Sequence, residues 1–200
     1  MAITAEQVKQ LRDKTGAGMM ECKAALTEAN GNEEEAITLL RKRGLAQAAK
    51  RAGRATAQGT IGTYIHLGGR IGVMVEVNCE SDFVARTDDF NSLVKEVAMH
   101  IAAADPRWVR REDVPAEALE KEKAIYRAQM ENSGKPANVL DKIVEGKLGS
   151  FYSQFVLLDQ PSIRDGNVTI AQVVAAASAK TGENIQISRF TRYRVGEGEA

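Results

Sequence analysis

Few side chains of this sequence could carry out covalent chemistry. It has two cysteines and two histidines among 200 residues, and Cys79 with His66 or His100 would be a nucleophile with its base. However, Cys79 ends a predicted strand, where a cysteine is usually a buried and inert thiol. The Cys and His spacings fit no metal site, and Gly68-Gly69 alone is typical of a turn. The sequence therefore predicts no catalytic residue, no metal site and no cofactor, in a protein that is not an enzyme.

The most unusual segment is residues 78–86 (NCESDFVAR), which joins a predicted strand to a long amphipathic helix. It places a carboxylate, Asp82, beside an aromatic ring, Phe83. From the residues alone, Phe83 is either an exposed contact or a core aromatic. Asp82 is either part of the same contact or a helix cap or loop carboxylate. This segment is the first candidate for a functional site.

Composition limits the classes of protein. Hydrophobic residues make up 44% and charged residues 27%, which is enough for a folded core. The 27 Lys and Arg balance 27 Asp and Glu, and this argues against a basic face dedicated to nucleic acid. No apolar run approaches the roughly 18–20 residues of a membrane span, and residues 1–6 do not resemble a secretion signal. We therefore expect a soluble, cytoplasmic protein that binds neither a membrane nor nucleic acid directly.

Charge is nevertheless uneven along the chain. Residues 1–57 carry ten Lys and Arg against seven Asp and Glu. Six of these cations fall in one window without acidic residues: Arg41, Lys42, Arg43, Lys50, Arg51 and Arg54. This basic window is either a contact for RNA or an acidic partner, or a solvated helix end followed by a linker. The second interpretation is favoured, because charge runs are usually solvated surface.

Residues 1–52 predict a small domain of three helices. A capping-box pattern at Thr4 and Gln7 begins the first helix, and Gly16 ends it. A second helix follows Gly18, and its apolar face consists of Cys22, Ala25, Leu26 and Ala29. A unit of this size buries little apolar surface and is only marginally stable by itself.

Two further expectations concern the second and third helices. Met19 and Met20 are adjacent on a helix and cannot both face one core, so at least one is predicted to be exposed. The third helix begins after Asn32 and is expected to end before Gly44. Residues 45–58 are then a fraying helix that becomes a linker.

Residues 53–200 predict an α+β domain with a small antiparallel sheet. Alternating apolar residues predict strands at 59–67 and 70–78, and a third strand over 185–195 closes the chain. A strict two-residue turn at Gly68-Gly69 would pair Ile65 with Gly72. We therefore expect a longer loop or a bulge there.

Helices of two kinds follow the first two strands. One is strongly amphipathic and ends at Asp105-Pro106, with an apolar stripe of Phe90, Leu93, Val94, Val97 and Ile101. Residues 116–150 carry narrower stripes on either side of a Gly134-Lys135-Pro136 turn, which predicts a protruding antiparallel helical hairpin. A second capping box, at Thr169 and Gln172, begins a last helix that runs to Lys180.

Five segments stand out in order along the chain: residues 11–26 (LRDKTGAGMMECKAAL), 71–85 (IGVMVEVNCESDFVA), 98–103 (AMHIAA), 133–136 (SGKP) and 143–148 (IVEGKL). Together they closely resemble the bacterial translation elongation factor Ts family. The length resembles the short form of that family, which has one core module. Ser81 and Ser162 depart from its usual pattern, which has Thr and Phe at these positions.

The resemblance implies a guanine-nucleotide exchange factor that binds elongation factor Tu in its GDP-bound and nucleotide-free states. It implies a UBA-like three-helix N-domain over residues 1–52 and a core domain over 53–200 that includes the helical hairpin. The segment Ser81, Asp82, Phe83 and Val84 would enter the partner and disturb its Mg²⁺ site. Further contacts are implied, position by position, for Arg12, Met19, Met20, Lys23, Ile71, Gly72 and His100.

Two other outcomes stay open at this stage. Short forms of the family can form a homodimer within a heterotetramer, and no feature of the sequence decides this. The alternative function is a UBA-like adaptor, or an RNA- or ribosome-binding protein without exchange activity, which would use the N-domain and the basic window.

Overall fold

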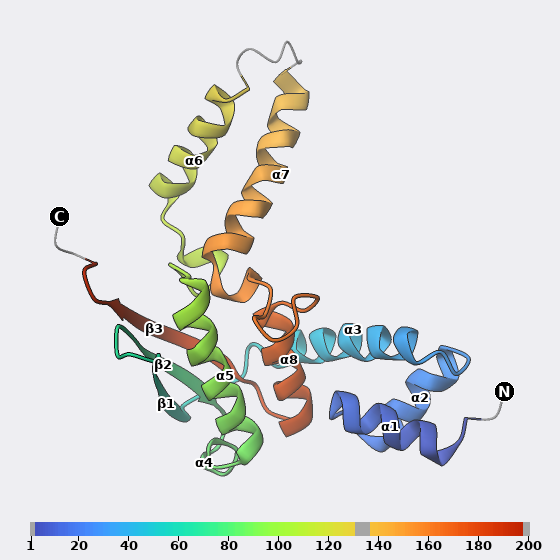
Figure 1. The fold of residues 1–200 in the computed structure, drawn as a ribbon. Coiled ribbons are helices and arrows are strands. Elements are labelled where there is room, and N and C mark those ends of the chain that lie inside the picture. Colours follow the sequence, from blue (N-terminus) through green and yellow to red (C-terminus); the bar gives the residue numbers. More distant parts are fainter. Residues whose placement is uncertain (1–2, 131–136, 198–200) are drawn as a thin grey trace.

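In the computed structural model, helices cover one face of a small sheet and extend away from it in two directions (Figure 1). The structure describes residues 3–130 and 137–197. The main elements are, in chain order, α1 (Ala5–Thr15), α2 (Met19–Glu28), α3 (Glu33–Arg51), β1 (Gln58–Ile65), β2 (Ile71–Cys79), α4 (Asp82–Ala85), α5 (Asp88–Ala104), α6 (Ala116–Ala128), α7 (Ala137–Phe155), α8 (Ile170–Thr181) and β3 (Gln186–Arg194). The predicted α+β class is confirmed. None of the helices described is both long and apolar enough to span a membrane.

The three N-terminal helices have a core of their own. Thr4 and Gln7 form the predicted capping box, and Gly16 ends α1 in the left-handed conformation with φ 68°. The buried side chains of this core are Val8, Leu11, Cys22, Ala25, Leu26, Ala29 and Ala36. The predicted apolar face of α2 is therefore confirmed.

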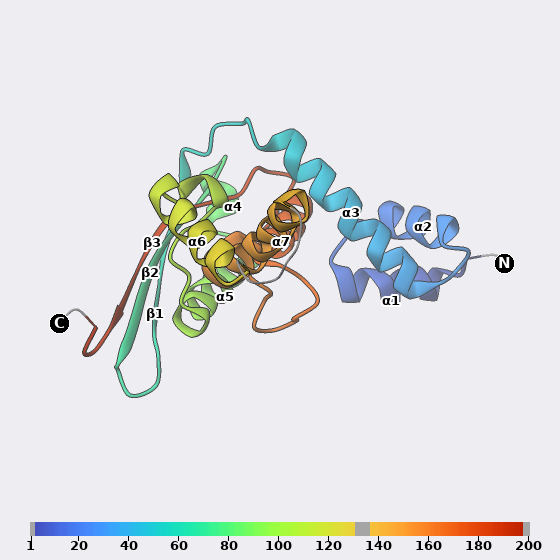
Figure 2. The same cartoon turned by 90° about the horizontal axis from the view of Figure 1, so that it is seen from above.

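Helix α3 does not end before Gly44, which corrects the expectation from the sequence. It continues to Arg51, and it packs against α8. Seen from above, α3 runs from the N-terminal helices towards the side of the molecule that holds the sheet (Figure 2). A Cβ at Gly44 would meet no atom within 4 Å, so glycine there costs only about 1 kcal/mol of helix propensity. Packing against α8, which no local pattern reveals, offsets that cost.

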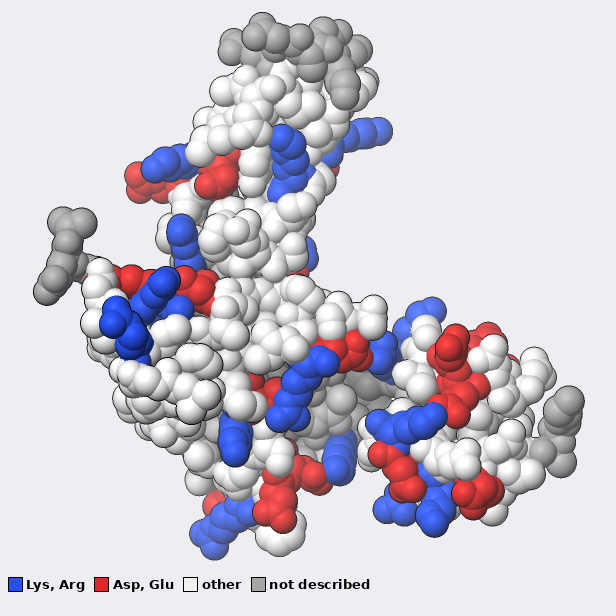
Figure 3. Space-filling model, in the orientation of Figure 1, with Lys and Arg blue, Asp and Glu red and all other residues white. Residues whose placement is uncertain are grey.

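Most of the basic window is bound to other parts of the chain. Arg41 pairs with Asp165 (3.4 Å), Arg43 with Glu28, and Arg54 with Glu80 (3.3 Å), while Arg51 donates to the Ser178 carbonyl (3.3 Å). On the face shown in Figure 3, basic and acidic side chains are interspersed. The window is therefore largely part of a docked helix, and the predicted linker begins only after it.

The sheet is antiparallel, in the order β1-β2-β3. The two strands of the first hairpin pair without a break, from Gln58 opposite Cys79 to Ile65 opposite Gly72. This is the register that a strict two-residue turn at Gly68-Gly69 would give, so the change of register expected from a longer loop or a bulge is wrong. A register shift lies elsewhere, in the pairing of β2 with β3.

Helix α5 covers one face of this sheet. Its predicted stripe is buried against the inward side chains of β2, and this main core includes Val73, Val75, Val77, Phe90, Leu93, Val94, Val97 and Ile101. The helix comes closest to β1 at Gly62, where a Cβ would lie 2.2 Å from Cγ1 of Val94. Glycine at this position therefore allows α5 to lie flat on the sheet.

The opposite face of the sheet lies open to solvent and carries large apolar side chains. Ile61, Ile65, Met74 and Tyr193 are 58%, 67%, 51% and 71% exposed, and we call them the open sheet face. The alternation predicts β1 correctly, but Ile61 and Ile65 lie on this open side, whereas Tyr64 packs against the main core. The residues between them, such as Gly62, are the ones that face α5.

Helices α6 and α7 form the predicted protruding hairpin, which Figure 1 shows at the end of α5 away from α4. Val144 and Leu148 of α7 are buried. At the base of the hairpin, Phe151 packs between the rings of Trp108 and Phe155 at centroid distances of 6.0 and 5.2 Å. The turn expected at Gly134-Lys135-Pro136 lies outside the described residues.

The contact of Gly62 with Val94 predicts a specific stability effect. Gly62→Ala should lower the free energy of unfolding by about 1–3 kcal/mol, the usual cost of an overpacked core. Gly146→Ala is the matched control, because a Cβ on this α7 glycine meets no atom within 4 Å, and alanine should gain about 0.5–1 kcal/mol there. Thermal unfolding followed by circular dichroism measures both. A Gly62→Ala protein as stable as wild type would contradict the close approach.

Candidate functional site

The segment between β2 and α5 forms the four-residue helix α4, and its two ends are fixed. The Ser81 Oγ caps the helix by accepting a hydrogen bond from the Val84 N–H at 3.3 Å. Val84 is only 5% exposed and belongs to the main core. Asp82 and Phe83, which lie between Ser81 and Val84, are therefore carried on a backbone that is fixed on both sides.

Phe83 projects from that base into solvent. Its side chain is 77% exposed, whereas Phe90 on the next helix is fully buried. The core-aromatic interpretation of Phe83 is thus excluded. An exposed phenylalanine contributes little to folding, and a large exposed apolar group is a common mark of a contact surface.

Asp82 is the first residue of α4, and the cap is Ser81. Its carboxylate accepts a hydrogen bond from Nη2 of Arg86 at 2.8 Å, and both side chains are mostly exposed. Exposed pairs of this spacing contribute only about 0.3–0.5 kcal/mol. Asp82 can therefore leave Arg86 for another partner at little cost.

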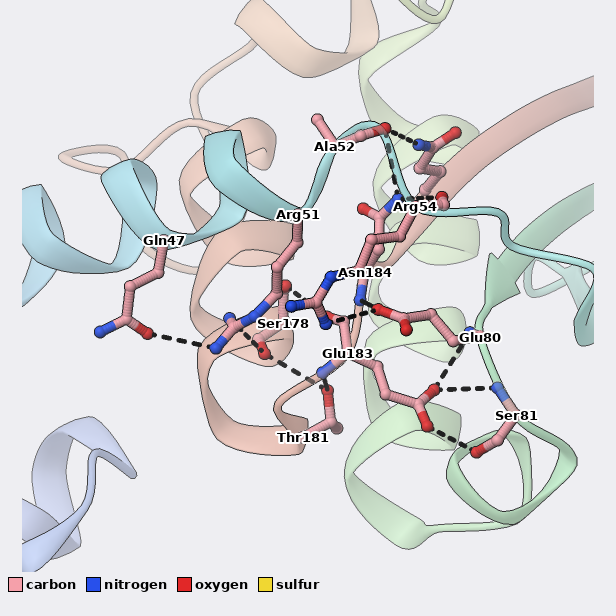
Figure 4. A network of polar contacts seen from close by, with 11 residues as sticks. Gln47, Arg51, Ala52, Arg54, Glu80, Ser81, Ser178, Thr181, Glu183 and Asn184 are labelled. Atoms are coloured by element: carbon pink, nitrogen blue, oxygen red, sulfur yellow. Dashed lines mark hydrogen bonds and ion pairs between the residues drawn. The ribbon is translucent and has the colours of Figure 1, made fainter.

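The base of the segment is held by a distant part of the chain (Figure 4). Glu183 lies in the turn after α8, and its carboxylate accepts hydrogen bonds from the N–H groups of Glu80 and Ser81, both at 3.0 Å. It also accepts one from the Ser81 hydroxyl at 2.6 Å. Sequence reasoning missed Glu183, because it is 102 residues from Ser81 and follows no local pattern.

The N-terminal candidates lie on α1 and at the beginning of α2. Arg12, Met19, Met20 and Lys23 are all exposed. Met20 is 76% and Met19 46% exposed, so the prediction that at least one of these methionines is exposed is confirmed. These four exposed side chains lie on different elements from Phe83.

Ile71 and Gly72 lie at the beginning of β2, whereas Phe83 follows its end. The strand between Ile71 and Cys79 spans about 26 Å at roughly 3.3 Å per residue. The structure therefore does not bring Ile71 and Gly72 together with Phe83. Gly72 instead pairs with Ile65, beside the open sheet face.

His100, for which the resemblance implies a contact with the partner, does not lie at the surface. It is fully buried, and its Nε2 lies 2.9 Å from Oε1 of Gln160. The Gln160 amide nitrogen donates to the carbonyls of Ala104 (3.1 Å) and Gln154 (2.7 Å). Its oxygen therefore faces His100 as an acceptor, and Nε2 carries the proton. In this fold the ring is not accessible to a partner.

The thiol considered for catalysis is buried as well. The Cys79 Sγ–H donates to the Ser81 carbonyl at 3.2 Å, and burial raises the pKa of this thiol. His100 is hydrogen-bonded to Gln160 instead, so the two residues do not form a nucleophile and base. Over residues 3–130 and 137–197, no three His, Cys, Asp or Glu side chains are grouped to hold a metal ion.

The environment of His100 predicts a pH dependence of stability. Burial lowers its pKa, and within the described residues its Nδ1 has no hydrogen-bond partner, so the folded protein favours the neutral ring. Below the unfolded pKa of about 6.5, the unfolded chain binds a proton that the folded chain does not. This contribution to stability is therefore complete above that pH and is lost as the pH falls, by up to about 1.4 kcal/mol per unit.

Urea unfolding at about pH 7.5 and 5.5 measures this effect. His100→Gln should flatten the dependence even where it lowers stability overall. Equal slopes for wild type and His100→Gln would contradict the assignment.

Comparison with known proteins places the chain in a family. The family described as "Elongation factor TS" matches residues 2–197. An elongation factor Ts from Fervidobacterium nodosum is 60% identical to this chain over 98% of its length and 100% of the relative. Those of Solibacter usitatus and Caldanaerobacter subterraneus are both 58% identical, over 98% of this chain and 93% and 98% of theirs. Because these matches run through all the elements described above, the chain belongs to the elongation factor Ts family.

Proposed function

We propose that this protein is a guanine-nucleotide exchange factor for elongation factor Tu in the elongation step of bacterial translation. It binds the GDP-bound partner, promotes release of GDP, and leaves a nucleotide-free partner that takes up GTP. No covalent bond is made or broken in this step. Membership of the family supports the proposal, and the observation that carries it is the 77% exposed ring of Phe83 beside Asp82.

In this proposal, Asp82 and Phe83 enter the nucleotide-binding domain of the partner. A GDP-bound G protein relies on Mg²⁺ to neutralise the phosphates. The Phe83 ring wedges partner helices apart, and the Asp82 carboxylate competes for groups that orient the water shell of Mg²⁺. Ser81 and Val84 act as the fixed base, because a wedge that moved freely would transmit no displacement.

The energetics require further contacts. Burying one exposed phenylalanine yields about 1.5–3 kcal/mol. Lowering the affinity for GDP about 10⁴-fold needs roughly 5.5 kcal/mol of preference for the nucleotide-free partner, and this coupling is reciprocal. We assign the remainder chiefly to the exposed surface of Arg12, Met19, Met20 and Lys23.

This assignment divides the chain into two units. Residues 1–52 would supply affinity, and residues 53–200 would carry out the exchange step. The separate hydrophobic core of the three N-terminal helices supports the division. The docking of α3 on α8 supports a fixed spacing between the two contact surfaces.

Exchange kinetics with two variants test the proposal. Phe83→Ala should reduce acceleration of GDP release steeply while the free energy of unfolding stays within about 0.5 kcal/mol of wild type, as for an exposed side chain. Asp82→Asn keeps the size and removes the charge. If Asp82 acts on Mg²⁺, its defect should shrink when a chelator removes the metal. Release of fluorescent GDP from elongation factor Tu, at millimolar Mg²⁺ and without it, gives both rates.

Phe90→Ala is the matched control, because this ring is fully buried and its loss should cost about 3–5 kcal/mol of stability. Binding of the partner without faster GDP release by the wild-type protein would overturn the exchange function and favour the adaptor alternative. An Asp82→Asn defect that is unchanged without Mg²⁺ would count against the metal as its target.

We further propose that the open sheet face binds a second copy of the chain, giving a homodimer within a heterotetramer. Two sheets commonly pack face to face, about 10 Å apart, through side chains such as Ile61, Ile65 and Met74. A two-fold axis would place the same face on both sides of the contact. Exposed apolar side chains of this size are a common mark of a contact surface, and here the Glu76–Arg189 ion pair lies among them.

Sedimentation equilibrium tests this contact. Met74→Lys should shift the protein from dimer to monomer, because an unpaired charge in the contact is strongly unfavourable. Ile163→Lys alters an exposed aliphatic residue (49%) away from the sheet and should leave the mass unchanged. A monomeric wild-type protein at all concentrations would contradict the homodimer.

A further inference from the structure

The turn after α8 meets the base of α4 through the carboxylates of Glu183 and Glu80 (Figure 4). Each carboxylate accepts hydrogen bonds from the backbone of the other segment, and we call this reciprocal contact the clasp. Glu183 accepts hydrogen bonds from the N–H groups of Glu80 and Ser81. In return, the Glu80 carboxylate accepts one from the Asn184 N–H at 2.6 Å. Neither segment can shift without breaking hydrogen bonds made by the other.

The clasp fixes the hydroxyl that caps α4. A serine hydroxyl has one proton and two lone pairs. The Ser81 proton is used towards Glu183 at 2.6 Å, so a lone pair is free to accept the Val84 N–H at 3.3 Å. Glu183 thereby selects the orientation of the cap from which Phe83 projects.

Glu183 is itself held in place. Its N–H donates to the Thr181 hydroxyl at 3.4 Å, and its carbonyl accepts the Ser178 hydroxyl. Its neighbour Asn184 is 4% exposed and donates through its side chain to the carbonyl of Arg54 at 2.9 Å, just beyond α3. Glu183 is therefore held by the end of α8 and by the chain just beyond α3.

We propose that Glu183 is a positioning residue for exchange, which sets the direction in which Asp82 and Phe83 are presented to the partner. This inference rests on the proposed function. A carboxylate fits the position because it accepts three hydrogen bonds from one face of the segment. A glutamine could keep its oxygen on both N–H groups, which share Oε2, but it would remove the negative charge and set its NH₂ group against the Ser81 hydroxyl, which now donates to Oε1.

Glu183→Gln tests the role, and Asp159→Asn is the matched control. Asp159 is also a half-buried carboxylate with more than one hydrogen bond, which it accepts from Arg111 at the base of the hairpin. Glu183→Gln should speed amide hydrogen exchange at Glu80 and Ser81 in the free protein. It should lower the maximal rate of GDP release roughly ten- to hundredfold, as for a misplaced catalytic geometry. The concentration of factor that gives half this rate should change little.

A double variant separates positioning from general stability. We call Asp82 and Phe83 the tip. If Glu183 acts through the tip, Glu183→Gln should add almost nothing to the loss of exchange rate already caused by the double change Asp82→Ala with Phe83→Ala. Glu183→Asp keeps the charge on a shorter arm and should give an intermediate rate. If Glu183→Gln does not fold cooperatively, the same rates are compared with Glu183→Asp instead.

The outcomes distinguish the inference from the function. A wild-type protein that does not accelerate GDP release would overturn the proposed function, and this role with it. Active wild type with an unchanged maximal rate in Glu183→Gln would overturn positioning alone. Positioning would also be overturned if Glu183→Gln changed only the half-saturating concentration of factor. It would be overturned as well if the rate losses of Glu183→Gln and of the Asp82 and Phe83 variants were fully additive.

Discussion

The packing of α5 on one face of the sheet is the constraint on which the rest of the structure depends. It forms the largest core, and it requires Gly62, since a methyl group there would overlap Val94. The helix is about 25 Å long at 1.5 Å per residue. It therefore separates the Asp82-Phe83 tip at its beginning from the hairpin of α6 and α7 beyond its end. The tip shares its base with the main core through Val84.

A second region of contact joins the three N-terminal helices to this core. Helix α3 packs on α8, and its last turn is bonded at Ser178. Asn184 then binds the chain just beyond α3 on one side and Glu80 on the other. The N-terminal surface and the tip are therefore oriented by one junction, so a partner that contacts both surfaces meets them at a defined spacing.

Features set by near neighbours in the sequence are predictable here, and those set by distant neighbours are not. The capping boxes at Thr4 and Thr169 and the stripe of α5 follow from spacings of three or four residues, and the structure has them as expected. The end of α3 does not follow, because Gly44 is overruled by packing against α8. The burial of His100 depends on Gln160, which comes 60 residues later.

The candidate site divides in the same way. Its motif can be recognised locally, because caps act within one helical turn, although the cap considered at Asp82 lies one residue earlier, at Ser81. The residue that holds the motif in place cannot be recognised locally. Glutamate is usually exposed, and Glu183 acquires its role only when the end of α8 brings it beside Ser81. The exposure of Phe83 also follows from the fold, because the four-residue length of α4 leaves no second turn to cover the ring.

That combination of a free ring and a fixed base has a mechanical consequence. A flexible loop carrying Phe83 could enter a partner, but it would absorb the displacement by changing its own conformation. Here Val84 is packed in the core and Ser81 is bonded to Glu183, so bending the tip would expose apolar surface and break charge-assisted hydrogen bonds. The softer side of the contact then has to move. Under the proposed function, the groups that would move are those of the partner's nucleotide site, where Mg²⁺ and a few loops hold the nucleotide.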